Sequence, residues 1–262
     1  MSEHSIGHPR FFDANCQVGR HNQRIEGTPY ALGDLIADMR EQAIAARLVH
    51  HAMAKENDTA AGNSRLMREI TGQEGLYPCW GLGTWVTGEM SRPADLLRQL
   101  RESNVRAVRF FRYSYAIPPD EWSMGELWTA LEEHCVPLVL DLGQRWATMD
   151  ELGAREVWEL CHAHPNLPVI LTKHRIRFNR QVYQLFEACP NLRLELSGYW
   201  HYRMVEDICL RFGRQRLLFG TNWPYMDSSF AIAAVMYAEV SDEDRVAVAG
   251  GNLRSLLEAV QW

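Results

Sequence analysis

Polar side chains interrupt the apolar stretch FFDANCQVGRH, residues 11–21, at regular spacing. Asp13, Asn15 and Gln17 are two residues apart, and alternate residues of a β-strand lie on one face. Because an amide offers donors and an acceptor, Asn15 and Gln17 could bind a substrate carboxylate or carbonyl, or could hold buried water. We expect Asp13 to hold neighbouring backbone in place.

Further residues that could do chemistry follow other apolar runs. His50 and His51 are adjacent on a strand-like run, so at most one of them can face a common site. Arg109 and Arg112 flank two phenylalanines, where a guanidinium needs either an acidic partner or an anionic ligand. Its forked donors suit a carboxylate, and for Arg109 we expect a ligand.

Asp141 ends an apolar run, so burial should disfavour its charge unless a cation lies nearby. Lys173, His174 or Arg109 could supply that cation. A paired Asp–Lys or Asp–His is a candidate general acid–base unit, and a structural ion pair is the alternative.

Two more polar candidates follow later apolar runs. We expect Asn222, within GTNWP, to act as a hydrogen-bonding group, and His201 to bind substrate. Tryptophans near the ends of these runs either pack the core or line a site for an apolar ligand: Trp80, Trp85, Trp146, Trp200 and Trp223.

The apolar runs themselves alternate with segments that have helical periodicity, such as LGDLIADMREQAIAA and RQVYQLFEAC. Eight β–α alternations in 262 residues predict an α/β fold, a (β/α)8 TIM barrel, as one domain over residues 1–262. A doubly wound sheet is the alternative, but no glycine-rich turn follows the first run. The predicted strands are 10–16, 47–51, 76–82, 105–111, 137–142, 168–172, 192–197 and 217–220.

Composition limits the possible partners. A net charge of −6 argues against a nucleic-acid partner, and no apolar run is long enough to span a membrane. Six scattered cysteines without a CxxC pair, and an amino terminus without a signal sequence, predict free thiols and a cytoplasmic protein. A homodimer is possible, but no segment of the sequence marks an interface.

The motifs resemble those of the amidohydrolase superfamily, in its amidohydrolase-related (type 2) branch of metal-dependent hydrolases and decarboxylases. FFDANCQVG is similar to that branch's first-strand motif D-x-H-x-H-x-G, and LLFGTNWPYMD to its eighth-strand motif F-G-[ST]-D-x-P. VPLVLDLG, LPVILTKHR and NLRLELSG are similar to the fifth, sixth and seventh strands. The resemblance covers at least residues 11–224 and implies a TIM barrel with its site at the carboxyl ends of the strands.

The metal ligands implied by this resemblance are mostly replaced. The two first-strand histidines become Asn15 and Gln17, the fifth-strand ligand becomes Asp141, and the eighth-strand aspartate becomes Asn222. The sixth-strand ligand falls on Lys173 or His174, depending on the register. Because amides are poor ligands for zinc or iron, we expect no tightly bound metal or other cofactor; a divalent ion such as zinc is the alternative.

These observations predict a small-molecule hydrolase of ester, lactone or amide bonds whose substrate is anionic with an apolar part. Asn15 and Gln17 would polarise a carbonyl, Arg109 would hold the anionic group, and Asp141 or His174 would take a proton from water. The other predicted site residues are Lys173 and Asn222, in catalysis, and His51, Arg112 and His201, in substrate binding. The alternatives are a decarboxylase and a non-catalytic barrel that binds a ligand or partner.

Overall fold

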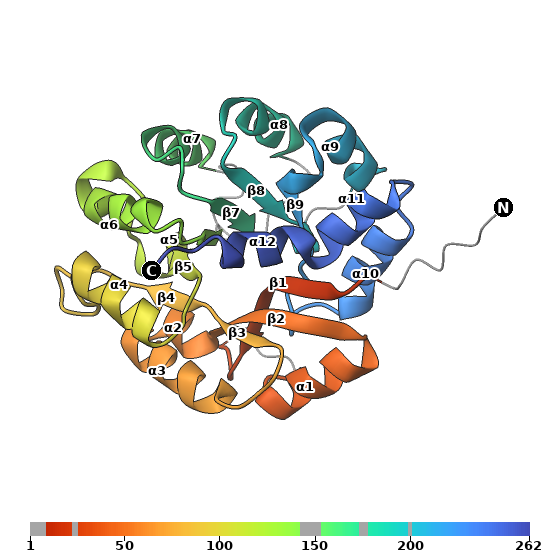
Figure 1. Cartoon of the computed structure of the whole chain (residues 1–262). Coiled ribbons are helices and arrows are strands. Elements are labelled where there is room, and N and C mark those ends of the chain that lie inside the picture. The colour runs from red at the N-terminus through yellow and green to blue at the C-terminus, as the bar shows by residue number, and fades with distance from the viewer. Residues whose placement is uncertain (1–8, 23–25, 142–152, 173–177, 199–200) are drawn as a thin grey trace.

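The strands of the protein form a closed parallel barrel surrounded by helices (Figure 1). The computed structural model describes residues 9–22, 26–141, 153–172, 178–198 and 201–262. In these residues the strands are β1 (Phe11–Val18), β2 (Ile44–His51), β3 (Leu76–Pro78), β4 (Trp80–Leu82), β5 (Val108–Phe111), β6 (Leu138–Asp141), β7 (Val169–Thr172), β8 (Leu192–Glu195) and β9 (Leu217–Leu218). All eight predicted runs therefore contain strands.

The third predicted run supplies two short strands, because the chain changes partners at Cys79. β3 pairs with β2, and β4 pairs with β5. The backbone N–H of Cys79 donates to Val49 at 2.8 Å and that of Trp80 to Ala107 at 3.3 Å, so the two sheets continue into each other. The other seam closes through Ala14 N–H to Phe219 O and Gln17 N–H to Trp223 O, both at 2.9 Å. The TIM-barrel prediction is confirmed.

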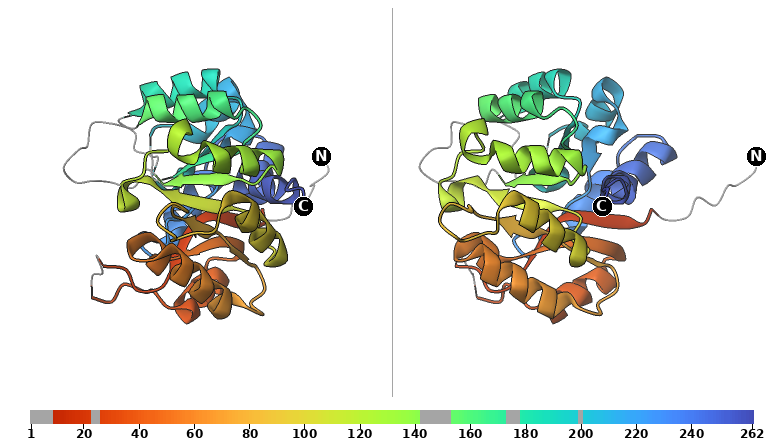
Figure 2. Two further views of the ribbon diagram at one scale, coloured as in Figure 1. Left: turned by 90° about the vertical axis from the view of Figure 1, so that its left-hand side faces the viewer. Right: turned by 60° about the vertical axis from the view of Figure 1, so that its left-hand side comes forward.

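Helices cover the outside of the strands, as two further views show (Figure 2). The connecting helices are α1 (Leu32–Glu41), α2 (Ala52–Glu56), α3 (Thr59–Ile70), α4 (Pro93–Glu102), α5 (Arg112–Tyr115), α6 (Glu121–Glu133), α7 (Ala154–Ala163), α8 (Asn179–Ala188) and α9 (Met204–Phe212), with short turns η2 (Leu196–Gly198) and η3 (Arg214–Arg216). Outward strand residues such as Val108, Phe110 and Leu140 pack against them in the largest hydrophobic core. No helix within the described ranges is long and apolar enough to cross a bilayer.

The carboxyl-terminal segment closes the amino-terminal end of the barrel. It consists of α10 (Ser228–Met236), α11 (Asp242–Val246), the π-helical η4 (Ala247–Gly251) and α12 (Asn252–Glu258). Gly251 and Asn252 both have helical dihedrals, so η4 and α12 form one continuous helical segment. Gly250 allows this segment to approach β1: a Cβ there would lie 2.5 Å from the Arg10 carbonyl oxygen.

Inside the barrel, the lower half is apolar. A cluster including Ala107, which comes just before β5, Val139 of β6 and Ile170 of β7 packs against Leu253 and Leu257 of α12. Figure 1 shows α12 crossing this end of the strands. Arg109 of β5, Asp141 of β6 and Thr172 of β7 each come two residues later along the chain, and alternation places them on the same inner face, nearer the carboxyl ends. The polar residues therefore form a layer above an apolar floor.

A bulge in β1 corrects one prediction. Asp13 pairs with Arg47 and Cys16 with Val49, so one extra residue of β1 lies between these pairs. Asp13 consequently does not share a face with Asn15 and Gln17, because a bulge shifts the alternation by one residue. Its carboxylate lies 3.6 Å from Arg47 Nε and accepts hydrogen bonds from the Thr221 backbone and hydroxyl, at 3.0 and 2.6 Å. Its expected role of holding neighbouring backbone is confirmed.

Candidate active site

The centre of the polar layer is Arg109, a β5 residue of which only 1% is exposed. Its Nη2 donates to Asn15 Oδ1 at 2.9 Å, to Asp141 Oδ2 at 2.9 Å and to Thr172 Oγ1 at 3.2 Å. Its Nε donates to the same Asp141 oxygen at 3.1 Å. Residues of three other strands thus hold the guanidinium of Arg109. Two of them, Asn15 and Asp141, were predicted site residues.

The ion pair between Arg109 and Asp141 is almost fully buried, with 1% of each side chain exposed. A buried carboxylate and a buried guanidinium each need a partner, and here each supplies the other. Of the three cations that could accompany Asp141, Arg109 is the one that does so in the described residues, and Arg109 therefore has the acidic partner that was the alternative to the expected ligand. Lys173 and His174, the other proposed cations, lie outside the described residues.

Asn15 links this ion pair to a second acid. Its amide Nδ2 donates to Glu195 Oε2 at 2.9 Å and to Ser197 Oγ at 3.1 Å, while its Oδ1 accepts from Arg109. Both ends of the amide therefore have protein partners. Sequence reasoning expected Asn15 to polarise a substrate carbonyl, but in this arrangement it connects protein groups.

Glu195 of β8 was not predicted as a site residue. It is fully buried, and burial is the main reason that its pKa rises to about 7. The Ser197 backbone N–H and hydroxyl donate to it at 2.5 and 2.8 Å and oppose that rise. The only signal in the sequence was an acidic residue inside the apolar run LRLELS.

Gln17 belongs to a second polar group, further toward the carboxyl end of β1. Its Oε1 lies 3.2 Å from His50 Nε2, and its Nε2 donates to the Tyr225 hydroxyl at 3.3 Å. The Tyr225 ring lies 4.6 Å from the His21 ring, and the His50 ring 5.5 Å from that of Phe111. Tyr225 and His21 were missed by sequence reasoning, since neither lies on a strand.

His51, unlike His50, does not join this group. It follows His50 on β2 and therefore points to the outer face. Its Nδ1 accepts from the Met53 backbone at 3.0 Å, and its Nε2 lies 3.7 Å from Glu69 of α3. Burial lowers the pKa of His51. The structure therefore gives His51 a helix-capping position and brings His50 to Gln17.

Two other predicted residues, Arg112 and His201, pair with residues of the outer helices. Arg112 forms an ion pair with Glu156 of α7. His201 lies beside the Tyr183 hydroxyl, 3.3 Å from its Nε2, and its Nδ1 lies 2.9 Å from the Tyr202 carbonyl oxygen. Neither contacts Arg109 through any hydrogen bond between described residues.

Asn222 follows β9 in a turn where its φ is +55°, a left-handed conformation that asparagine tolerates well. Its carbonyl accepts from the Tyr225 backbone at 2.9 Å, so the turn positions Tyr225. Its side chain has no hydrogen-bond partner among the described residues. Nearby Trp223 packs on the outer side with Cys16 and Leu35, which favours a packing role for it. Trp146 and Trp200 lie outside the described residues.

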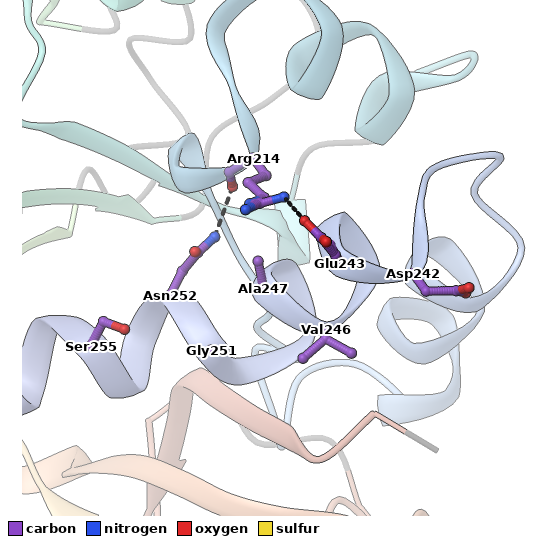
Figure 3. A pocket seen from close by; sticks show the side chains of 8 residues that line it. All are labelled: Arg214, Asp242, Glu243, Val246, Ala247, Gly251, Asn252 and Ser255. Carbon is purple, nitrogen blue, oxygen red and sulfur yellow. Dashed lines mark hydrogen bonds and ion pairs between the residues drawn. The ribbon is translucent and has the colours of Figure 1, made fainter. Parts of the chain in front are cut away.

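A surface cavity of about 540 Å³ lies at the opposite end of the barrel, where η3 and η4 meet (Figure 3). The figure shows Arg214 extended toward Glu243, with Asn252 beside the Arg214 backbone. Arg214 is 3.0 Å from Glu243 and 3.2 Å from Asp244, and Asn252 donates to the Arg214 carbonyl at 2.7 Å. Arg214 and Glu243 of its lining thus pair with each other, and the cavity is separate from the polar layer.

The amidohydrolase family model matches residues 34–258, and the chain belongs to this family. The match begins after β1, the strand whose expected histidines are amides here. No curated protein matches the sequence.

Solved structures share the fold at low identity. Dihydroxybenzoic acid decarboxylase from Polaromonas sp. JS666, with bound manganese, has a TM-score of 0.72 at 15% identity over 96% of this chain and 97% of that chain. 5-Carboxyvanillate decarboxylase from Sphingomonas paucimobilis has a TM-score of 0.71 at 10% identity, over 96% of this chain and 99% of that chain. A putative 2-pyrone-4,6-dicarboxylic acid hydrolase from Pseudomonas putida has a TM-score of 0.68 at 16% identity, over 96% of this chain and 98% of that chain.

A divalent metal such as the manganese held by one protein of this fold needs carboxylate or imidazole donors. The described residues contain no group of three or more His, Cys, Asp or Glu side chains placed to hold one. Asn15 and Gln17 are neutral amides, and Asp141 is engaged by Arg109, whose guanidinium is 2.9 Å from both Asn15 and Asp141 oxygens. A divalent ion at these oxygens would lie beside a fixed positive charge. The described residues therefore do not fit a divalent metal.

Proposed function

We propose that the protein is a hydrolase of an ester, lactone or amide bond in a small carboxylate substrate, and that Arg109 replaces a tightly bound metal as the cation of the site. The observation that carries this proposal is the position of Arg109: it is buried at the carboxyl ends of the strands and hydrogen-bonded through Nε and Nη2. Its Nη1 has no hydrogen-bond acceptor among the described residues, which leaves two donors for a substrate anion.

The surroundings of Arg109 support a substrate with an apolar part. The Phe111 ring lies 5.8 Å from the guanidinium carbon, and the same ring contacts His50. A carboxylate bound at Nη1 would thus place an attached ring or chain near Phe111. We infer a small molecule that carries a carboxylate on an apolar frame.

In the proposed reaction, a water molecule attacks the substrate carbonyl carbon and the bond to the leaving oxygen or nitrogen breaks. Asp141 accepts the proton of the water and returns it to the leaving group, a role worth about 10²–10⁴-fold in rate. Arg109 holds the carboxylate, and Gln17 with Tyr225 contacts the rest of the substrate. Proposed roles for Lys173 and His174 in the same proton transfer remain predictions.

Decarboxylation is a second candidate, because two of the structural neighbours are decarboxylases. It would use the same carboxylate contact but would break the bond between the carboxyl carbon and the substrate frame. The two reactions differ in product: hydrolysis yields a new acid, and decarboxylation yields CO₂. The product therefore distinguishes the two reactions directly.

The test uses chelator-treated protein and a panel of pyrone, lactone and dihydroxybenzoate carboxylates, with acid release and CO₂ release followed separately. We expect acid release from a lactone or ester, and a fall in kcat of about 100-fold or more in Asp141→Asn. Asp95→Asn is the matched control, since Asp95 pairs with Arg98 on the surface of α4, 54% exposed. Restoration of activity only by added manganese or zinc would contradict the proposal.

A rise in melting temperature with a carboxylate ligand but no turnover would instead favour a non-catalytic binding barrel. All six cysteines are free, as predicted, and this supports the proposal of a reducing, cytoplasmic location. A homodimer also remains a proposal, to be tested by the mass of the protein in solution.

A further inference from the structure

The hydrogen bonds of the polar layer have fixed directions. Arginine only donates, so Asn15 must present its carbonyl oxygen to Arg109 and its NH₂ group to the other side. That NH₂ group meets Glu195 Oε2 at 2.9 Å and Ser197 Oγ at 3.1 Å. An acceptor at position 195 is therefore what keeps the amide in the orientation that Arg109 requires.

Both oxygens of Glu195 face N–H donors. Oε1 accepts from the Ser197 backbone N–H at 2.5 Å, and Oε2 accepts from the Asn15 amide. A glutamine at 195 could satisfy only one of them, because its NH₂ group would face either the Ser197 N–H or the Asn15 NH₂. A carboxyl group, which offers one acceptor oxygen to each donor, is thus required by hydrogen-bond geometry and not by volume.

The neighbouring strand makes room for this carboxylate. A Cβ added at Gly220, just after β9, would lie 2.1 Å from Glu195 Oε1. The charged groups that act on Glu195 from the packed strands are Asp13 of β1 and Arg109 of β5. No cation contacts the Glu195 carboxylate directly among the described residues.

We propose that Glu195 is a positioning residue: through the Asn15 amide, it fixes the guanidinium of Arg109 in the orientation that binds the substrate anion. This inference rests on the proposed role of Arg109. It extends the site to a residue that does not itself contact substrate, and it explains why Asn15 has both ends of its amide engaged. Glu195, Asn15 and Arg109 thus form a chain of hydrogen bonds with one fixed direction.

The first test reads Arg109 directly and needs no substrate. The hydrogen-exchange rate of its Nε–H is measured by NMR, with the signal assigned by Arg109→Lys. In Glu195→Gln the Asn15 amide faces a second donor, and we expect exchange at least about tenfold faster, equivalent to about one lost hydrogen bond. Glu239→Gln is the matched control, since Glu239 is 77% exposed and pairs with Arg203; its Arg109 signal should be unchanged.

The second variant reverses the polarity of the pair. In Asn15→Asp/Glu195→Gln, the new Asp accepts from both Arg109 and the new Gln, and the Gln oxygen accepts from the Ser197 N–H. Total charge is conserved and every donor again meets an acceptor. We expect slow exchange to be restored to within about threefold of wild type, because paired residues are not additive. A double variant no better folded or ordered than Glu195→Gln would overturn the inference.

Binding of benzoate separates this inference from the proposed function. It is measured by calorimetry in wild type, Glu195→Gln, Glu239→Gln and the double variant. We expect affinity to fall about tenfold in Glu195→Gln and to recover in the double variant. If wild type binds no benzoate but the exchange rates follow the expected order, the positioning role stands and the proposed ligand class fails. Unchanged exchange in Glu195→Gln overturns the positioning role, whatever the ligand does.

Discussion

Arg109 shows how one residue can determine the character of a site. Its guanidinium supplies a permanent positive charge, fixed by Asn15, Asp141 and Thr172, at the level where the family resemblance places metal ligands. An arginine differs from a metal ion because it cannot be removed by a chelator and donates hydrogen bonds in a plane. The chemistry expected of the site is therefore anion binding by hydrogen bonds.

Glu195 gives a prediction at the same scale, for stability against pH. Its pKa is about 7 in the folded protein against 4.5 for the free side chain, so the folded state holds its proton more tightly. The contribution of this proton to the free energy of unfolding is fully present below about pH 4.5 and is lost as the pH rises through 7. The total is on the order of 3 kcal/mol.

This contribution is measured by urea unfolding at pH 5, 6, 7 and 8. The free energy of unfolding of wild type should fall over this range relative to Glu195→Gln, in which nothing titrates at that position. The effects of the other titrating groups cancel when the curve of Glu195→Gln is subtracted from that of wild type. Parallel curves would show that burial does not raise the pKa of Glu195 as described.

At the scale of elements, the bulge in β1 decides which polar residues reach the site. Without it, Asp13 would lie on the same face as Asn15 and Gln17. With it, Asp13 joins Arg47 and Asp38 between the barrel and its outer helices, and Asn15 reaches Arg109. One extra residue in a strand thus separates a structural acid from the candidate active site.

The close packing of α2 on α3 gives a prediction for an element. A Cβ at Gly62 of α3 would lie 2.2 Å from the Ala54 backbone nitrogen, so Gly62→Ala must push the helices apart. We expect a loss of about 2 kcal/mol or more in the free energy of unfolding. Gly33→Ala on α1 is the control: nothing lies within 4 Å, and alanine should be neutral or stabilising by up to about 1 kcal/mol. Equal effects in urea unfolding would contradict the packing.

At the scale of the whole molecule, the barrel has a dry end and a polar end. The apolar floor and α12 close the amino-terminal end, and the polar layer lies above them. Water is thereby excluded from below the Arg109–Asp141 pair, which strengthens the electrostatic interactions of that pair. The helix α12 near the carboxyl terminus packs on residues of β1 near the amino terminus, so the two ends of the chain meet at this end of the barrel.

Leu253 of α12 tests that closure. It is 1% exposed and packs on the floor, so Leu253→Ala should leave a cavity and lower the free energy of unfolding by about 2–5 kcal/mol. Leu210→Ala on α9 is the control, since Leu210 is 86% exposed and should change stability by less than about 0.5 kcal/mol. Similar losses in the two variants, measured by urea unfolding, would argue against a packed floor.

The sequence by itself determined the barrel, because the alternation of apolar runs and amphipathic segments is local and repeats along the chain. It also determined that Asn15, Gln17, Arg109 and Asp141 lie near strand ends, since strand period and strand order suffice for that. The replacement of expected metal ligands by amides was likewise visible from residue types alone.

Only the tertiary structure decided which of these residues meet. The bulge that turns Asp13 away, the choice of His50 over His51, and the pairing of Arg112 with Glu156 depend on register and on helices distant in sequence. Glu195 became part of the site because β8 places it, fully buried, against Asn15 of β1, and no local pattern records that contact. Hydrogen-bond direction and burial are properties of the assembled barrel, and they determine what each polar side chain can do.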